Sequence, residues 1–446
     1  MIVDAGARRH AWRGRNPELT DRHSPWRGRN PELTDCNNPW RGLPARGRWR
    51  RRDMSTVTRI TGALTAIALL VTPAVCQEAA EAPQGLPLRD ALAAAKPGAT
   101  VYVASGTYEG GLHLDGLQGT EDAPIVIAGA DSENPPVIEG GGSGLHLVNA
   151  THVELRDLVL RGATGNGLNI DDGGDYATPA HHITLRRVCV EDVGPEGNRD
   201  GIKLSGVDDF QVIDCTVERW GSGGSAIDMV GCHRGLIEGC TFRHEEGTVA
   251  TGVQNKGGTS EIVIRRNHFD HAGARAVNIG GSTGLQYFRP PPQGYEAKDI
   301  VVEGNVFINS QAPVAFVGCD GAMVRFNTMY MPGRWALRIL QETREPGFVP
   351  CRDGVFTDNI IVFRSDAWSE GGVNIGPGTA PETFTFARNA WYCLDRPEVG
   401  PRLPTEEQDG LVGEDPIFVD AQDGDFRLQP GSPAEGRGHT ALEDLQ

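Results

Sequence analysis

Two rows of polar residues are the part of this 446-residue sequence whose spacing could support chemistry. Short segments such as GIKLS, AIDMV and GVQNK recur, with apolar residues at alternate positions. If the apolar residues face inward, their polar neighbours face outward. The first outward row contains Asn169, Lys203, Asp228, Gln254, Asn278 and Asn374. The second row, two residues further along each segment, contains Asp171, Ser205, Val230 and Lys256. Such rows are typical either of a site for a polar ligand or of an ordinary solvated sheet.

Lys256 is the strongest catalytic candidate. It lies in TGVQNKGGTSEIVIRRNHF (251–269), where Gly257 and Gly258 leave its amine uncrowded. The segment resembles the polysaccharide lyase family that includes chondroitinase B and alginate lyases, and this resemblance implies that Lys256 is the base of a β-elimination. A base that removes the proton next to a uronate carboxylate must be neutral, a form that nearby cations such as Lys203 or Arg275 would favour. A solvated surface lysine is the alternative.

The expected partners of this base depart from the pattern of that family. The family places an Arg-His-Gly one coil later, where this sequence reads AVNIGG (276–281). Arg275 and, two coils on, Arg338 are the substitutes that we expect to neutralise a uronate carboxylate. Val249 and Thr251 stand where the family has calcium-ligating acids. No cofactor is therefore certain, and calcium would need other ligands.

Two carboxylate-rich segments offer oxygen ligands. DDGGD (171–175) is either a surface turn or a calcium site with the ligands Asp171, Asp172 and Asp175. NRDGIKLSG (198–206) contains Asp200 and Lys203, and Asp228 follows one coil later. This group could orient a sugar, or it could have only a structural role where a turn leads into a strand. Asp200 and Asp228 would lie about 4.8 Å apart, near the carboxylate separation of a retaining glycoside hydrolase.

An insertion at residues 280–298, GGSTGLQYFRPPPQGYEAK, places aromatic residues and Arg289 beside a triple proline. A stiff loop of this kind could stack Tyr287 on a sugar ring, or its aromatic residues could pack the loop against the coil. Tyr287 and Lys203 are candidates for the acid that protonates the leaving oxygen. The residues that we expect to contact a sugar are Asn169, Asp200, Asp228, Gln254, Asn278, Tyr287 and Arg289.

These side chains must be positioned by a sequence repeat whose copies are 22 to 38 residues long. Segments of the form apolar-x-apolar-x-x-Cys/Asn-x-apolar recur with their marked residue at Cys189, Cys215, Cys240, Asn267, Asn305, Asn327, Asn359 and Asn389. No segment is long enough to fold alone, so we predict that the repeats stack as an all-β parallel solenoid. Identical side chains would then form a ladder, with asparagine amides bonded along the stack.

The two ends of the repeat region add a second resemblance. A short helix at 88–96 followed by TVYVASGTYEGG (100–111) resembles the N-terminal cap of secreted right-handed parallel β-helix proteins. The segment 415–438 is similar to the tail of bacterial β-helix polysaccharide lyases and their uncharacterised relatives. We therefore predict one right-handed parallel β-helix over 77–440, with an N-terminal cap at 85–111 and a C-terminal tail at 411–440.

The first 76 residues differ from the rest. Residues 1–53 are rich in Arg and Pro and repeat WRGRNPELTD, so we expect disorder, consistent with sequence upstream of a true start at Met54; an RNA-binding arm is the alternative. Residues 54–76 have the features of a signal peptide, with an apolar stretch too short to span a bilayer. The mature protein is expected to be secreted, periplasmic or attached to the cell envelope, without an integral membrane segment.

Charge and composition limit the classes of molecule that the protein is expected to bind. Residues 77–446 contain 28 basic and 53 acidic residues, a net charge of −25 that disfavours nucleic acid. Glycine supplies 59 residues without a collagen period. We expect a monomer that binds a polysaccharide. It is either a lyase or epimerase that acts on uronates, a non-catalytic glycan-binding or envelope protein, or a hydrolase that uses Asp200 and Asp228.

Overall fold

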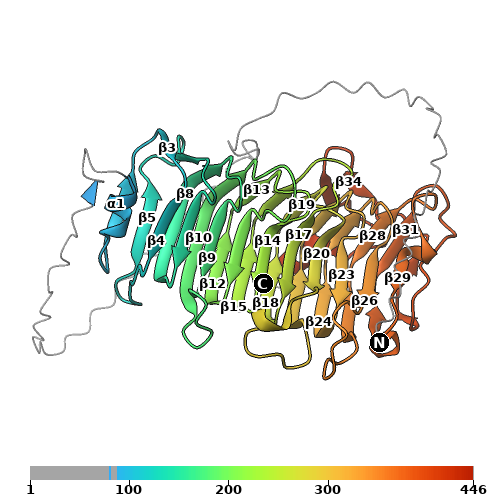
Figure 1. The fold of residues 1–446 in the computed structure, drawn as a ribbon. Coiled ribbons are helices and arrows are strands. Elements are labelled where there is room, and N and C mark those ends of the chain that lie inside the picture. Colours follow the sequence, from blue (N-terminus) through green and yellow to red (C-terminus); the bar gives the residue numbers. More distant parts are fainter. Residues whose placement is uncertain (1–79, 82–87, 445–446) are drawn as a thin grey trace, which may run out of the picture. The chain divides into compact units, whose positions relative to one another are not determined.

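A computed structural model describes residues 80–81 and 88–444. The expected disordered stretch (1–53) and the expected signal peptide (54–76) lie outside these residues and stay predictions. The regular structure of the described residues is mostly β-strand, with two short α-helices, α1 (Leu88–Ala93) and α2 (Gly438–Asp444). Its strands wind as a parallel β-helix, as the repeat predicts, and Figure 1 shows the successive coils side by side along the molecule.

One face of the coil is a ten-stranded parallel sheet that carries both polar rows. In chain order its strands are β4 (Leu112–Asp115), β7 (Leu145–Val148), β9 (Leu168–Asp171), β11 (Ile202–Ser205), β14 (Ser225–Val230), β17 (Thr251–Lys256), β20 (Arg275–Gly280), β23 (Val314–Val317), β26 (Leu337–Leu340) and β29 (Val373–Ile375). Each strand pairs with the strand one coil later, because every repeat contributes one strand to this face.

The other faces form a single 23-stranded sheet that contains two rows of strands. One row consists of β1 (Ala80–Glu81), β2 (Thr100–Val103), β5 (Ile125–Gly129), β8 (Thr151–Arg161), β10 (Ala180–Glu191), β12 (Val207–Ile213), β15 (His233–Glu238), β18 (Thr259–Arg265), β21 (Ala297–Glu303), β24 (Cys319–Arg325), β27 (Arg352–Thr357), β30 (Thr385–Ala387) and β32 (Glu407–Gln408). The other consists of β3 (Thr107–Glu109), β6 (Val137–Glu139), β13 (Thr216–Glu218), β16 (Thr241–Arg243), β19 (His268–Asp270), β22 (Val306–Ile308), β25 (Thr328–Tyr330), β28 (Ile360–Phe363), β31 (Ala390–Cys393) and β33 (Leu411–Val412). The long strands β8 and β10 run through both rows.

Asparagines at equivalent positions form a buried ladder inside the coil. The Nδ2 of Asn305 donates to Oδ1 of Asn327 at 3.0 Å, and the Nδ2 of Asn327 donates to Oδ1 of Asn359 at 2.9 Å. These oxygens also accept backbone N–H groups of the preceding coil. The ladder thereby satisfies polar groups that would otherwise be buried without partners. This stacking confirms the repeat spacing inferred from the sequence.

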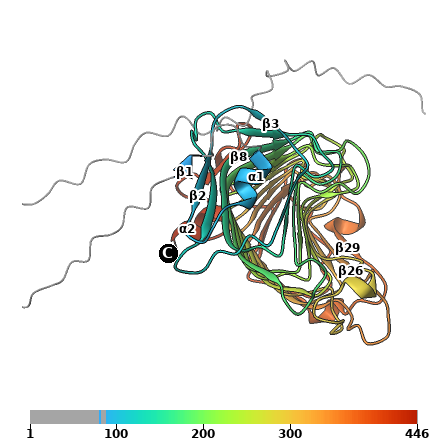
Figure 2. The ribbon, with the colours of Figure 1, turned by 60° about the vertical axis from the view of Figure 1, so that its left-hand side comes forward.

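The two ends of the described chain are finished differently. Leu92 of α1 is fully buried, and Figure 2 shows α1 in front of the stacked coils at the N-terminal end. Near the C-terminus, β34 (Phe418–Asp420) and β35 (Asp425–Leu428) form an antiparallel hairpin. Phe426 of this hairpin packs on Tyr330, with ring centroids 5.1 Å apart. The tail therefore packs against strand β25. No helix in the described ranges is long and apolar enough to cross a membrane.

Candidate functional site

The strand register makes the first polar row continuous across the ten-stranded sheet. Coil by coil, the paired residues are Asn169, Lys203, Asp228, Gln254, Asn278, Ala315, Arg338 and Asn374. Lys256 lies in the second row, paired with Val230. Because neighbouring coils are about 4.8 Å apart, Lys203, Asp228 and Lys256 come within reach of one another.

Asp228 is the centre of a lysine–aspartate cluster that consists of Asp200, Lys203, Asp228 and Lys256. Its Oδ2 accepts a hydrogen bond from the Nζ of Lys203 and lies 3.1 Å from the Nζ of Lys256. The Nζ of Lys203 also lies 3.8 Å from Oδ2 of Asp200. Asp228 is fully buried, whereas the lysine side chains are 19% and 18% exposed. The shared carboxylate therefore lies beneath the Nζ atoms of both lysines.

Burial and neighbouring charges set the protonation of this cluster. Burial and the negative charge of Asp228 raise the pKa of Asp200 to about 6, although Lys203 opposes the shift. Burial favours the neutral form of Lys203, but the carboxylates of Asp228 and Asp200 outweigh it and raise the pKa of Lys203. Lys203 is therefore an ammonium ion at neutral pH, the cationic form in which the sequence analysis placed it.

A cavity of about 700 Å³ adjoins the cluster. Lys203 and Lys256 line it, together with Asn169, Asp171, Ser205 and Val230 of the polar rows and the neighbouring Asp172. Asp200 and Asp228 are not among the lining residues. A ligand in this cavity would meet the amino groups of the lysines, while the two carboxylates hold those groups in place from below.

The loop between β20 and β21 forms another wall of this cavity. It contains the 3-10 helix η1 (Leu285–Tyr287), and Tyr287 lines the cavity with a 59% exposed side chain. Arg289, expected to contact a sugar, is only 6% exposed. Its guanidinium donates to both oxygens of Asp208 at 2.8 Å and to the Gly231 carbonyl at 2.6 Å. Arg289 therefore anchors the loop to the coil and also lines the cavity, where Tyr287 is the more exposed of the two.

Close packing of this loop also depends on glycine. Gly231 adopts a φ of +59°, and a Cβ at this position would lie 2.6 Å from the Cβ of Arg289. The loop ends at Glu296, which is fully buried and accepts the backbone N–H groups of Gly257 and Thr283 at 2.9 and 2.8 Å. These contacts hold the cavity wall in one position.

Arg275 and Arg338, expected beside Lys256, lie elsewhere on the sheet. Arg275 pairs with Thr251 at the start of β17, whereas Lys256 ends that strand, a span of about 16 Å. Arg275 donates to Glu342 at 2.7 Å. Arg338 donates to Asn374 at 2.9 Å, and burial together with the charge of Arg275 lowers the pKa of Arg338 to about 10. The structure therefore does not bring these arginines to Lys256: Arg275 is separated from it along the strand, and Arg338 lies three coils further on.

Gln254 and Asn278 lie between Asp228 and Arg338 in the first polar row. Asn278 is 2% exposed; its Oδ1 accepts from Arg275 at 3.2 Å and its Nδ2 donates to the carbonyl of Gly280 at 3.1 Å. Gln254 faces Ser225, with Oε1 and Oγ 3.4 Å apart. Neither residue lines the 700 Å³ cavity, so the cavity follows only the part of the polar rows around Lys203 and Lys256.

The three aspartates considered for calcium do not converge. Asp172 and Asp175 accept the N–H groups of Gly174 and Ala177 in local turns. Asp171 accepts the N–H of Gly173, and its Oδ2 lies 2.6 Å from Nε2 of His146. Burial raises the pKa of Asp171, but the bond to His146 leads the contacts that reverse this effect and leave the pKa lowered. These residues do not fit a calcium site, and no step below involves one.

The sequence analysis missed the histidines. His113 and His146 precede Asn169 in the first polar row, and extending the repeat alignment by two coils would have found them. In the described part of the chain, the one group of three or more metal-ligating side chains with ligand atoms within 4.8 Å of one another is His152, His181 and His182. It lies on the 23-stranded sheet.

Comparisons with known proteins support the fold. Residues 143–328 match the family model described as a right-handed beta helix region. No curated protein matches the sequence. The structure of pectate lyase Pel9A superposes with a TM-score of 0.51 at 13% identity, covering 79% of this chain and 86% of that chain. An alginate lyase from Paenibacillus sp. str. FPU-7 gives 0.44 at 20% identity, with coverages of 66% and 96%. A rhamnogalacturonan lyase gives 0.47 at 12% identity, with coverages of 77% and 92%.

At these identities the likeness concerns the fold alone, and of the three only pectate lyase Pel9A superposes with a TM-score above 0.5. Together with the strand pairing, it identifies the chain as a right-handed parallel β-helix similar in fold to that pectate lyase.

Proposed function

We propose that this protein is an exported polysaccharide lyase that cleaves uronate-containing glycans by β-elimination in the cavity beside Lys203 and Lys256. The observation that carries the proposal is the arrangement of two lysines that line a cavity above one shared, fully buried carboxylate. The ammonium group of Lys203 faces the cavity and suits an acidic sugar, although Asp171 and Asp172 also line the cavity and the chain as a whole is strongly acidic. Export rests on the signal peptide expected at residues 54–76.

The two lysines have different surroundings, which suggests different roles. Lys203 contacts Asp228 and lies near Asp200, so it keeps its proton and can pair with the uronate carboxylate. Lys256 shares only the Asp228 oxygen within this cluster. Lys256 is therefore the less paired of the two amines, and it is freer to turn toward a ligand in the cavity. Lys256 in its neutral form is therefore our candidate for the base.

The reaction balances with these groups. Neutral Lys256 takes the C5 proton of the uronate and becomes an ammonium ion. The electron pair forms the C4–C5 double bond as the C4–O4 bond breaks. Lys203 stabilises the negative charge that develops on the carboxylate. The leaving oxygen takes a proton from the hydroxyl of Tyr287 or from water, which completes an alcohol and an unsaturated uronate.

The placement of the carboxylates makes hydrolysis the weaker alternative. Asp200 is 2% exposed and Asp228 is fully buried, and neither lines the cavity. A general acid must come within hydrogen-bond reach of the glycosidic oxygen. With the lysine amines between them and the ligand, these aspartates suit a supporting role better than a catalytic one.

An assay of unsaturated products tests the proposal. The purified protein is incubated with alginate, pectate and chondroitin, with and without calcium, and the ultraviolet absorbance of the new double bond is followed. We expect turnover of at least one polymer, and we expect Lys256→Ala to abolish it. Lys256→Arg should abolish it too, because arginine keeps the charge but does not deprotonate. Lys298→Ala, on the 23-stranded sheet, is the matched control and should leave the rate unchanged.

Each other outcome points to a different function. New reducing ends without ultraviolet absorbance would indicate a hydrolase. Saturable glycan binding without any product would indicate a non-catalytic glycan-binding protein. Activity retained in Lys256→Ala would refute the assignment of the base, whichever polymer is cleaved.

A further inference from the structure

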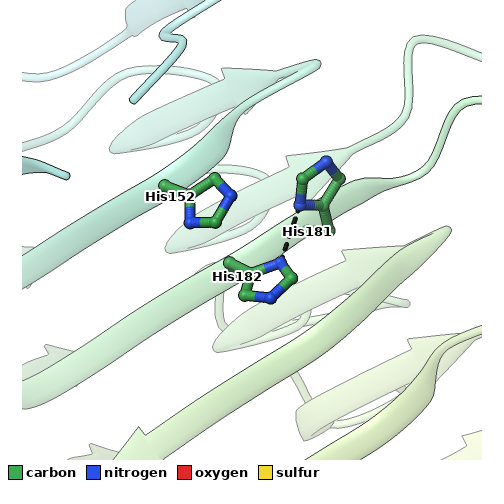
Figure 3. A group of neighbouring side chains, drawn as sticks. All are labelled: His152, His181 and His182. Carbon is green, nitrogen blue, oxygen red and sulfur yellow. Dashed lines mark hydrogen bonds between the residues drawn. The ribbon is translucent and has the colours of Figure 1, made fainter. Parts of the chain in front are cut away.

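Three histidines gather on the 23-stranded sheet, away from the polar rows. His152 belongs to β8, and His181 and His182 belong to β10, one coil later. The rings of His152 and His182 stack with centroids 4.3 Å apart and an interplanar angle of 20°. The Nδ1 atoms of His181 and His182 lie 2.8 Å apart, and Figure 3 shows the three rings drawn together.

The coil itself sets this geometry. Thr151 pairs with His181 and Val153 pairs with Ile183, so His152 and His182 occupy the same position in successive coils. Both have left-handed backbone conformations, with φ of +48° and +55°. A left-handed residue interrupts the alternation of a strand. The two imidazoles are therefore stacked by the register of the backbone, and His181 joins them from the adjacent position.

Imidazole nitrogens are suitable ligands for a transition-metal ion. Neutral imidazole is the ligand form, and it prefers ions such as Zn²⁺, Ni²⁺ and Cu²⁺. Three acids lie near the group: Glu121, Asp208 and Asp209. Asp208 is paired with Arg289 and Asp209 with Arg234, both at 2.8 Å, so these arginines partly compensate the negative charge near a bound cation.

His182 is exposed, so an ion can reach the group from solvent, and His181 also lines a cavity of about 500 Å³ together with Gln118 and Thr151. Three protein ligands leave one position of a tetrahedral ion for water or another ligand. Zinc–nitrogen distances of about 2.0–2.1 Å correspond to a separation of about 3.3 Å between ligand nitrogens, so the nitrogens of His181 and His182 would need to move apart by about 0.5 Å. The stacked rings of His152 and His182 would also need to turn about their side-chain bonds, because a ring nitrogen binds a metal in the plane of its ring.

We propose that His152, His181 and His182 form a binding site for a divalent transition-metal ion, with Zn²⁺ as the first candidate. The ion would replace the hydrogen bond between His181 and His182 and join the two coils through β8 and β10. This site is independent of the proposed lyase chemistry, since it lies on the other sheet.

Titration with the metals themselves tests the site. The full chain is prepared without a polyhistidine tag, treated with EDTA and titrated with Zn²⁺ by calorimetry; Co²⁺ is added in parallel because its visible spectrum reports coordination. We expect one site per chain, weakened at least 100-fold in His152→Asn and in His182→Asn. Asparagine tolerates the left-handed conformation, so these variants keep the backbone intact. His113→Ala, on the ten-stranded sheet, should bind as the unchanged chain does.

Thermal unfolding provides the second measurement. Zn²⁺ should raise the unfolding temperature of the unchanged chain and of His113→Ala, and not that of His182→Asn. Circular dichroism checks that each variant is folded before titration. Absence of Zn²⁺ and Co²⁺ binding by the unchanged chain would overturn the proposal. Equal Zn²⁺ affinity in the unchanged chain and in both asparagine variants would also overturn it.

Discussion

The asparagine ladder should carry a large share of the stability of the coil, and Asn327→Ala tests this directly. Asn327 is fully buried at the middle of the ladder. Its Oδ1 accepts the backbone N–H and the amide of Asn305, both at 3.0 Å. Its Nδ2 donates to the carbonyl of Val302 at 3.0 Å and to Asn359 at 2.9 Å. Alanine removes all of these bonds without providing a substitute.

The expected loss follows from the groups left without partners. A buried donor or acceptor that loses its hydrogen bond costs about 1–3 kcal/mol. The backbone N–H of Asn305, one of its amide hydrogens and the carbonyl of Val302 each lose a partner. We therefore expect Asn327→Ala to lower the free energy of unfolding by about 4 kcal/mol.

Urea unfolding followed by circular dichroism measures this change. Asn134→Ala is the control, because Asn134 is exposed on a turn and its replacement should change the free energy by less than about 0.5 kcal/mol. A loss below about 1 kcal/mol for Asn327→Ala would refute the reasoning. It would mean that water or a shifted strand satisfies the ladder positions as well as the amides do.

Three further predictions concern the site. Because the raised pKa of Asp200 makes the folded chain bind that proton more tightly than the unfolded chain, stability is lost as pH rises through about 6. In urea unfolding between about pH 4 and pH 8, Asp200→Asn should reduce the pH-dependent loss of unfolding free energy by about 2–3 kcal/mol. The same pH dependence in the variant and in the unchanged chain would contradict this prediction. Arg289→Met should cost about 3 kcal/mol and speed proteolysis of the loop at 281–296, since Asp208 loses its bidentate partner; resistance equal to that of the unchanged chain would argue against the anchor. If the protein cleaves a uronate polymer, Tyr287→Ala should raise KM about 3- to 10-fold and Tyr287→Phe should not, whereas equal effects would assign the role to the hydroxyl.

The repeat could be predicted because a solenoid imposes its period on the chain. Each inward residue must match a neighbour one coil away, so a buried asparagine is stable only above another hydrogen-bonding group. This requirement explains why asparagine recurs at the equivalent position of successive repeats from Asn267 to Asn389. The outward rows follow from the same register, which is why the sequence alone predicts that Lys203, Asp228 and Lys256 lie close together.

The contacts of long side chains could not be predicted in this way. The partner of Arg289 is Asp208, 81 residues away, and only the folding of the loop over the coil brings them together. Arg275 was expected near Lys256 as the nearest substitute for the arginine of the missing Arg-His-Gly, but it pairs with Thr251, five residues before Lys256. The alignment of Gln254 with Asn278 already implies this separation, so this error came from the resemblance and not from the register.

The sequence by itself determined the parallel coil, its period, and which residues share a face, because these depend on the alternation of apolar side chains and on matching between repeats. The tertiary structure decided which charges meet and which are covered. In the structure Asp228 lies beneath two lysines, and Arg289 anchors the loop to the coil through Asp208. His152 stacks on His182 because both have a left-handed backbone conformation, which histidine as a residue type does not predict. These outcomes depend on the direction of each side chain and on what packs over it, and both are set by contacts between coils.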